Sequence, residues 1–544
     1  MNVQTRKIVE LLKKGKPEHQ MAAAIVLGEL RARDQEAVKA LGQTLGPASK
    51  QVRAACVEAL GKIGSPAGLT FLMPLLEIED ADLRSRALEA LSAFGPKAVS
   101  FISGRLTDSP PTVRRALVTV LSRIADKRST DALLSLISSG HPEAARESAH
   151  ALSERATGMT RAERRAIKSR VERILKAPAR KAHGATLSAG LGLLGAFGDT
   201  SSAPLILKLA GPGYPETVRK EALLSVGAAI KGTMASMKIV TGIFALLTEK
   251  TPHALTTTAL EVLYRMEIPK GSSTSLIKLL DARDPAVRRF AARKLGNLGG
   301  IRAARRLVAL LSDSDPSLRD AVADSLSRMP ESVMLLMDLL ERQTDIHRAW
   351  TVAHIVKNHA QKIPAPILRE HIKKTVDLLL RGERIAEPWM HVARHAGPRL
   401  LYSALMSRAA RLKKARRYAE VEALLRPLLR TEEFDTSARF ELALASLRAS
   451  AYVEGVPPRT PDSPLDLFKQ LARDPAFPFI QRIRKERGHL DSEDLYWLGF
   501  HLAEGAGEEK SIGAELLRMV AQNEGKSKLG RNARNKLKLE DLSS

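Results

Sequence analysis

Aromatic residues, cysteines and long hydrophobic runs are all scarce in this chain of 544 residues. Phe, Trp and Tyr together make up 4% of the residues, which favours helices rich in Ala and Leu over a β-sandwich or β-barrel. The single cysteine, Cys56, excludes an internal disulfide framework and a metal site made of several thiolates. No segment approaches the ~18 consecutive apolar residues of a membrane-spanning helix.

The first 20 residues contain neither an apolar core of signal-peptide length nor a small-residue cleavage site. We therefore expect a cytoplasmic protein that does not bind membranes. A short basic amphipathic helix is expected at 8–16, and we assign it to the first repeat because a paired apolar stripe follows it directly. The chain is too long for one compact core, which indicates several domains or an elongated repeat array.

Positive charge is abundant. Lys and Arg number 86 against 60 Asp and Glu, a formal net charge of +26. This excess is compatible with nucleic acid, an anionic membrane surface or acidic proteins as partners, and by itself it selects none of them.

One helical pattern repeats over the first two-thirds of the chain. In DPAVRRFAARKLGNLG (284–299), Val287, Ala291, Leu295 and Leu298 lie on one stripe of a helix, with charged residues on the other side. The Asp-Pro pair at its start suits the N-cap and the first helical position, and glycine suits its end.

Ten such stripes can be aligned, and seven of the nine spacings between their first residues fall within 30–33 residues. The stripes begin at His19, Val52, Leu83, Val113, Ala145, Thr186, Val218, Leu255, Val287 and Leu318. A shorter apolar helix is expected between successive stripes, for example at 69–76. Because one helix pair cannot bury its own stripe, the pairs must stack on one another. The sequence therefore predicts an all-α protein, an α-solenoid of antiparallel helix pairs.

These units resemble HEAT repeats, in particular the short bacterial lyase-type kind. The resemblance is carried by SKQVRAACVEALGKIG (49–64), ADLRSRALEALSAFG (81–95), DPAVRRFAARKLGNLGG (284–300) and DPSLRDAVADSLSRM (315–329). It implies a HEAT/armadillo-like superhelix over roughly residues 1–330. It implies little about function, because HEAT arrays serve as scaffolds, adaptors, nucleic-acid binders and, rarely, enzymes.

Changes in composition divide the chain into six predicted regions. A basic helical insertion at 158–181 accounts for the 41 residues that separate Ala145 from Thr186. The predicted regions are a HEAT-like solenoid (1–330), degenerate helical repeats (331–399), a hairpin that resembles one tetratricopeptide unit (400–451), a Pro-rich linker (452–466), a C-terminal helical module (467–525) and a basic tail (526–544).

Basic runs with few or no acidic residues are the strongest functional signal. They supply these candidate partner-binding residues: Arg161, Arg164, Arg165, Lys168, Arg288, Arg289, Arg293, Arg302, Arg305, Arg306, Arg408, Arg411 and Lys413. On one surface they could neutralise several phosphates. However, 161–181 and 408–417 contain no aromatic residue on which single-stranded bases would stack. We expect an acidic protein partner, with sequence-independent DNA or RNA binding as the alternative.

Other conspicuous residues have structural explanations. An arginine follows the first stripe residue in six copies, and we expect it to pair with an Asp or a carbonyl of the neighbouring repeat rather than to form a ladder of free cations. Cys56 occupies a stripe position and is expected to be buried. His391 and His395 have the spacing of two metal ligands on one helix, but no HExxH motif accompanies them.

An enzymatic function finds little support. HEAT-like DNA glycosylases use a Trp and a carboxylate about one helical turn further on, whereas Trp350, Trp389 and Trp497 are followed at that position by His or Ala. No Gly-rich phosphate loop, nucleophile elbow or metal-ligand cluster is present. We expect a non-enzymatic interaction scaffold without a cofactor. A glycosylase or a lyase-type chaperone remains a remote alternative.

Overall fold

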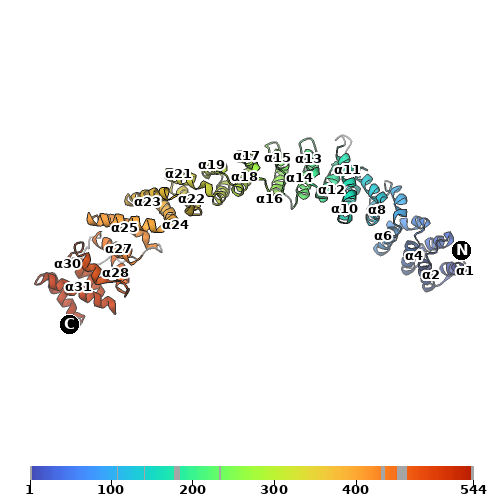
Figure 1. Cartoon of the computed structure of the whole chain (residues 1–544). Helices are drawn as coiled ribbons and strands as arrows, with labels where there is room; N and C mark the ends of the chain where they lie inside the picture. Colours follow the sequence, from blue (N-terminus) through green and yellow to red (C-terminus); the bar gives the residue numbers. More distant parts are fainter. Residues whose placement is uncertain are drawn as a thin grey trace. The chain divides into compact units, whose positions relative to one another are not determined.

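The computed structural model describes residues 3–106, 108–139, 141–176, 184–231, 234–430, 435–449 and 462–540. Within these ranges it contains thirty-two α-helices, nine short 3-10 segments and no strand (Figure 1). The predicted all-α solenoid is confirmed. By their internal contacts, residues group into two compact units, Met1–Ala291 and Ala292–Ser544.

Unit 1 (Met1–Ala291) consists of two layers of helices that alternate along the chain. The helices that carry the apolar stripes form one layer, which we call the stripe layer: α2 (Pro17–Glu29), α4 (Lys50–Ile63), α6 (Ala81–Ala93), α8 (Pro111–Arg123), α10 (Pro142–Arg155), α12 (Gly184–Ala196), α14 (Glu216–Ala229) and α16 (His253–Arg265).

The intervening helices form the second layer: α1 (Val3–Lys14), α3 (Gln35–Thr44), α5 (Leu69–Leu72), α7 (Pro96–Ser103), α9 (Lys127–Ile137), α11 (Arg161–Lys176), α13 (Ala203–Leu209), α15 (Met237–Phe244) and α17 (Ser273–Leu279). Five 3-10 segments supplement them: η1 (Pro66–Gly68), η2 (Met73–Leu76), η3 (Ala156–Gly158), η4 (Thr200–Ser202) and η5 (Lys270–Ser272). Helix α18 (Pro285–Leu298) contains the boundary with the second unit.

The predicted stripes form the core of this unit. Val52, Cys56, Leu60 and Ile63 of α4, for example, are all at most 1% exposed. The first copy is an exception, because His19 and Leu30, the two ends of its predicted stripe, are exposed. The buried part of this stripe is therefore shorter than predicted.

Glycines fix the register between neighbouring helices of the stripe layer. Gly28 of α2 faces Ala59 of α4, and Gly61 of α4 faces Ala90 of α6. A Cβ atom added to Gly61 would lie 3.0 Å from both Cα and Cβ of Ala90, which is tighter than ordinary packing. Gly195 of α12 meets the backbone of α14 in the same way. The backbones can approach this closely because these positions lack a side chain.

The arginine that follows the first stripe residue joins each stripe helix to the segment before it. Its side chain donates hydrogen bonds to backbone carbonyls in five copies: Arg84 to Ile78 (3.1 Å), Arg114 to Leu106 (2.9 Å), Arg219 to Ala210 (3.0 Å), Arg288 to Leu280 (3.2 Å) and Arg319 to Asp313 (2.8 Å). The expected structural role is thus confirmed, with the acceptors in the turn just upstream. Arg53 differs, because its Nε is buried without a hydrogen-bond partner among the described residues.

Helix α11 explains the long spacing between Ala145 and Thr186. It follows α10 and precedes α12, so it takes the place that a second-layer helix takes in the other repeats. Its 16 residues make it the longest second-layer helix of unit 1. The spacing is therefore lengthened by a longer regular helix and by residues 177–183, which lie outside the described residues; between α10 and α12 the described part of the chain contains no other α-helix than α11.

Unit 2 (Ala292–Ser544) begins with the same alternation. Stripe helices α20 (Pro316–Leu326), α22 (Ile346–Lys357) and α24 (Ala386–Ala396) alternate with α19 (Ile301–Ala309), α21 (Val333–Arg342) and α23 (Ala365–Leu380). Short segments η6 (Leu310–Ser312), η7 (Pro330–Ser332) and η8 (Ala360–Lys362) lie between them. The helix alternation therefore continues beyond residue 330.

The last part of unit 2 contains α25 (Pro398–Lys414), α26 (Tyr418–Leu425), η9 (Arg426–Arg430), α27 (Thr436–Ala449), α28 (Pro464–Ala472), α29 (Phe479–Lys485), α30 (Ser492–Ala503), α31 (Glu508–Glu524) and α32 (Lys528–Leu539). Most of the predicted linker at 452–466 lies outside the described residues, and α28 begins within its last residues. The predicted domain boundaries remain predictions. The division between the two compact units falls inside α18.

Candidate partner-binding site

The predicted cations of α11 differ in their surroundings. Lys168 forms an ion pair with Asp199, and Arg164 donates a hydrogen bond to the Met159 carbonyl at 3.3 Å. Arg161 and Arg165 are exposed and form no hydrogen bond or ion pair with any described residue. The two latter residues are thus available to a partner, whereas Lys168 holds α11 against the following repeat.

The candidate arginines between positions 288 and 306 are divided in a similar way. Arg288 is half-buried and bonded to the Leu280 carbonyl, and Arg289 is also half-buried. Three others are exposed without a hydrogen bond or ion pair in the described part of the chain: Arg293, Arg302 and Arg305. Arg306, on the same short helix α19 as Arg302 and Arg305, is exposed too.

Lys413 is not available to a partner. The side chain is buried, and its Nζ lies 2.6 and 2.8 Å from the two carboxylate oxygens of Glu441 and 3.1 Å from Glu486. Arg482 donates to the same Glu441 at 2.9 Å. The prediction that Lys413 contacts a partner is therefore corrected: the residue belongs to the core. Arg411 is exposed, and Arg408 is half-buried.

Three cations in the stripe layer of unit 1 are matched by carboxylates on neighbouring helices. Lys62 of α4 pairs with Glu29 of α2, Arg86 of α6 pairs with Glu58 of α4, and Arg115 of α8 pairs with Glu147 of α10. A track for a phosphate backbone needs cations without such carboxylates. This part of the stripe layer is therefore unsuited to nucleic acid.

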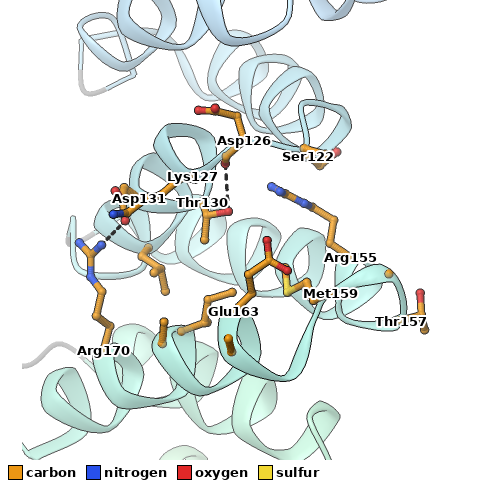
Figure 2. Close-up of a pocket in the computed structure, with 16 residues that line it drawn as sticks. Ser122, Asp126, Lys127, Thr130, Asp131, Arg155, Thr157, Met159, Glu163 and Arg170 are labelled. Atoms are coloured by element: carbon orange, nitrogen blue, oxygen red, sulfur yellow. Dashed lines mark hydrogen bonds and ion pairs between the residues drawn. The ribbon is translucent and has the colours of Figure 1, made fainter.

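A pocket of about 710 Å³ lies between α9 and α11 (Figure 2). Leu134 of α9 and Ala162, Ala166 and Ile167 of α11 contribute its apolar lining, together with Met159. The pocket lies where the lengthened helix α11 replaces the shorter helix of the other repeats. Its volume suits one or two large side chains of a partner.

A capping box fixes the start of α11 at the edge of this pocket. The Glu163 amide donates to Thr160 Oγ1 at 3.3 Å, and the Thr160 amide donates to Glu163 Oε2 at 2.8 Å. This reciprocal pair satisfies two backbone amides at the start of the helix. These bonds hold the pKa of the Glu163 carboxyl below its usual range, so this rim residue is an anion at neutral pH.

The rim of the pocket carries charges of both signs. Asp131 forms an ion pair with Arg170, and Asp126 caps α9 by accepting a hydrogen bond from the Arg128 amide at 2.8 Å. Figure 2 shows the Arg155 and Glu163 side chains projecting into the space between the two helices. The rim is thus mixed in charge rather than uniformly basic.

Arg155 has unused hydrogen-bonding capacity. Its Nη1 donates to Ser129 Oγ at 3.0 Å, and it forms no ion pair with any described carboxylate. Partial burial lowers the pKa of this guanidinium, an effect that the charges of Glu163 and Asp126 oppose. A half-buried guanidinium with free donors favours a carboxylate or carbonyl acceptor brought by a ligand.

Neither Arg155 nor the pocket was identified from the sequence. The available signals were the 41-residue spacing and the capping box at Thr160, which together mark a repeat with unusual geometry. Which side chains line a pocket depends on how far α11 stands from α9, and the stripe pattern does not encode that distance.

Cys56, His391 and His395 pack among other side chains of the protein. Cys56 is buried as predicted, and burial raises the pKa of its thiol to about 12. The rings of His391 and His395 are 4.5 Å apart, and Trp350 and His354 pack against His391. Among the described residues, no group of three or more His, Cys, Asp or Glu is arranged to hold a metal ion.

Comparison with known proteins identifies the repeats. The sequence model of the HEAT-repeat family matches residues 5–92 and 273–355. The tetratricopeptide resemblance of the C-terminal part finds no such match. No curated protein matches the chain. None of the helices in the described ranges combines the length and apolar character that a membrane crossing requires.

Solved structures with a similar fold include Kap121p bound to Pho4p, with 11% identity and a TM-score of 0.39; the match covers 99% of this chain and 78% of that chain. They also include importin beta in an ammonium sulfate condition, with 10% identity and a TM-score of 0.32, covering 99% of this chain and 84% of that chain.

Proposed function

Because residues 5–92 and 273–355 are HEAT repeats, we propose that the chain is a non-enzymatic scaffold that binds a protein partner. The observation that carries this proposal is the pocket between α9 and α11, with its apolar lining and its rim of mixed charges. Protein interfaces are anchored by large side chains that enter such pockets while polar groups at the rim fix their orientation.

The charge of the chain favours an acidic partner. A net charge of +26 accelerates encounters with polyanionic surfaces. At short range, Arg155 offers donors to a carboxylate that enters the pocket together with an apolar side chain. The exposed cations Arg161 and Arg165 lie on α11, the helix that forms one wall of the pocket.

The alternative function, sequence-independent binding of DNA or RNA, is favoured by one observation. Arg302 and Arg305 are exposed and unpaired among the described residues, and with Arg306 they lie on one short helix, α19. Against it stand three ion pairs between helices of the stripe layer in unit 1, each of which matches a cation with a carboxylate.

A pocket-filling variant tests the scaffold function. Ala166 lines the pocket and is exposed, so Ala166→Trp should fill the space without disturbing the core. Ser169→Trp, on an exposed position of the same helix outside the pocket, is the matched control. Peptides selected on the wild-type chain from a random library displayed on phage should bind Ala166→Trp at least about tenfold more weakly, the effect of losing about 1.4 kcal/mol, and bind the control unchanged.

The same proteins should be titrated with a mixed-sequence DNA duplex at low and at physiological salt. We expect duplex binding to disappear at physiological salt, because generic charge attraction is screened. Tight binding that persists there, and that is lost when Arg302, Arg305 and Arg306 are changed to Glu, would contradict the scaffold proposal and establish the nucleic-acid alternative.

A further inference from the structure

A second groove, of about 600 Å³, lies on the stripe layer of unit 1. Its floor is α12, and its walls are side chains of α10 and α14. It is lined from Pro142 to Ser153 along α10, which corresponds to about 16 Å of helix at 1.5 Å per residue. An extended chain of about five residues has the same length.

The groove exists because α12 has almost no side chains on its outer face. Gly184, Ala185, Ser188 and Gly192 occupy that face, and α12 (GATLSAGLGLLGA) contains no charged residue. Helices α4, α6 and α8 instead carry long charged side chains toward their neighbours, as the ion pair of Arg86 with Glu58 shows. The surface of α12 is therefore recessed between the side chains of α10 and α14.

Glu221 of α14 lines this groove. It is half-buried, and no described residue forms a hydrogen bond or ion pair with it. Its Oε1 lies over Gly192, 3.3 Å from the place where a Cβ atom would be. Burial raises the pKa of the Glu221 carboxyl, and the charge of Arg146 opposes this only in part. A carboxylate that has lost water without gaining a donor is a costly arrangement that a cationic ligand relieves.

The opposite wall supplies complementary polarity. Arg146 of α10 is exposed, lines the groove, and has no hydrogen bond or ion pair with any described residue. His150 lies one helical turn further along the same wall. A segment in the groove therefore meets a carboxylate on the α14 side and a guanidinium on the α10 side. A basic side chain of that segment would pair with the carboxylate, and its free backbone carbonyls would accept hydrogen bonds from the guanidinium.

We propose that this groove binds an extended segment of the protein partner by pairing a lysine or arginine side chain of that segment with Glu221. The proposal rests on the scaffold function and names the chemistry of one recognised residue. The small residues of α12 let the backbone of the segment approach closely. The overall positive charge of the scaffold selects partners by net charge at long range, whereas the half-buried Glu221 selects a single cationic residue at contact distance.

The test uses the full chain and the same phage-displayed random peptides. Selection on the wild type should enrich peptides with Lys or Arg whose affinity falls at least about tenfold on Glu221→Gln, a neutral side chain of the same shape. Glu261→Gln is the matched control, because Glu261 is an exposed carboxylate of the neighbouring stripe helix α16 and does not line the groove. Ser188→Trp, which fills the floor, should abolish the same binding.

The outcomes separate this inference from the scaffold proposal. Selected peptides that lose affinity on Ala166→Trp but bind Glu221→Gln as tightly as the wild type would overturn the groove proposal and leave the scaffold function standing. Failure to enrich any peptide on the wild type would overturn both. If light scattering shows that the wild type self-associates and Glu221→Gln does not, the occupant of the groove is a second copy of the chain, and the proposal of a foreign segment is wrong.

Discussion

The two compact units differ in what they bury. In the described part of unit 1, every buried side chain classed as polar or charged is a Ser or Thr. In unit 2, the buried set also includes His359, His371, Lys413, Glu441, Asp494, Glu509 and Lys536. Unit 1 is therefore held together by apolar stripes and close backbone approach, whereas unit 2, toward its C-terminal end, depends on buried ionisable groups.

This difference has a physical reason. A repeat array places equivalent residues in equivalent environments, so small residues such as Gly61 and Ala90 set the helix spacing and no partner for a buried charge is needed. The C-terminal helices of unit 2 do not follow this repeat, and polar side chains specify which helices meet. Buried ion pairs add little net stability, but the loss of one partner is costly.

The largest effect is expected from Lys413→Ala. The substitution leaves Glu486 without its cation in a buried site and Glu441 with Arg482 alone, which should destabilise this part of unit 2 by about 3–5 kcal/mol. Lys414→Ala removes an exposed neighbouring lysine and should change stability by less than about 0.5 kcal/mol. Local opening energies from amide hydrogen exchange measure both. Equal effects of the two substitutions would contradict the contrast between the units.

Acid should destabilise unit 2 through His371. This side chain is buried, its Nε2 donates to the Trp389 carbonyl at 3.0 Å, and burial lowers the pKa of its imidazole from 6.5 to about 4. The unfolded state therefore takes up a proton first as the pH falls. The contribution of His371 to stability is fully present above pH 6.5 and is lost as the pH falls toward 4, up to about 3 kcal/mol.

Hydrogen exchange around α23 and α24 at pH 7 and at pH 4.5 measures this loss. His371→Phe keeps a ring against Trp389, with which His371 stacks at 4.6 Å, and removes the titrating group. In that variant, the local opening free energies at pH 7 and at pH 4.5 should differ by less than they do in the wild type. A pH dependence unchanged in His371→Phe would assign the acid sensitivity to other groups.

The sequence predicted the fold well because a solenoid is encoded locally. The stripe at Val52, Cys56, Leu60 and Ile63 needs only the helical period to be recognised, and the structure buries all four residues. The regular spacing between stripes then indicates that successive helix pairs stack on one another. The ends of the first stripe, His19 and Leu30, are exposed, and the helical period alone does not show where along a stripe burial stops.

The candidate sites were less predictable because they depend on distances between helices. Arg302 and Lys413 both occur in basic runs, yet one is exposed and the other is enclosed by two glutamates that are 28 and 73 residues away in the chain. Glu221 is a single carboxylate on a helix, and no motif in the sequence distinguishes it from others. Its environment depends on Gly192 of another helix, because the missing side chain there leaves the space into which Glu221 projects.

The glycine register of unit 1 predicts an intermediate effect. Gly61→Val places branched atoms where a Cβ would already lie 3.0 Å from Ala90, so α4 and α6 must move apart. Such overpacking costs about 1–3 kcal/mol. Gly46→Ala is the control, because a Cβ there meets no atom within 4 Å. Thermal unfolding followed by circular dichroism compares the two, and a Gly61→Val protein as stable as the wild type would show that close approach does not set the register.

The smallest effect is expected from the ion pairs of the stripe layer. Arg115 Nε lies 2.6 Å from Glu147 Oε1, with the Arg115 side chain 63% exposed. Pairs of this kind contribute less than about 1 kcal/mol and are screened by salt. A double-mutant cycle of Arg115→Ala and Glu147→Ala at low and high salt should therefore give a small coupling energy that falls with salt. A coupling as large as the effect of Lys413→Ala would mean that unit 1, too, depends on charge, and the distinction between the two units would fail.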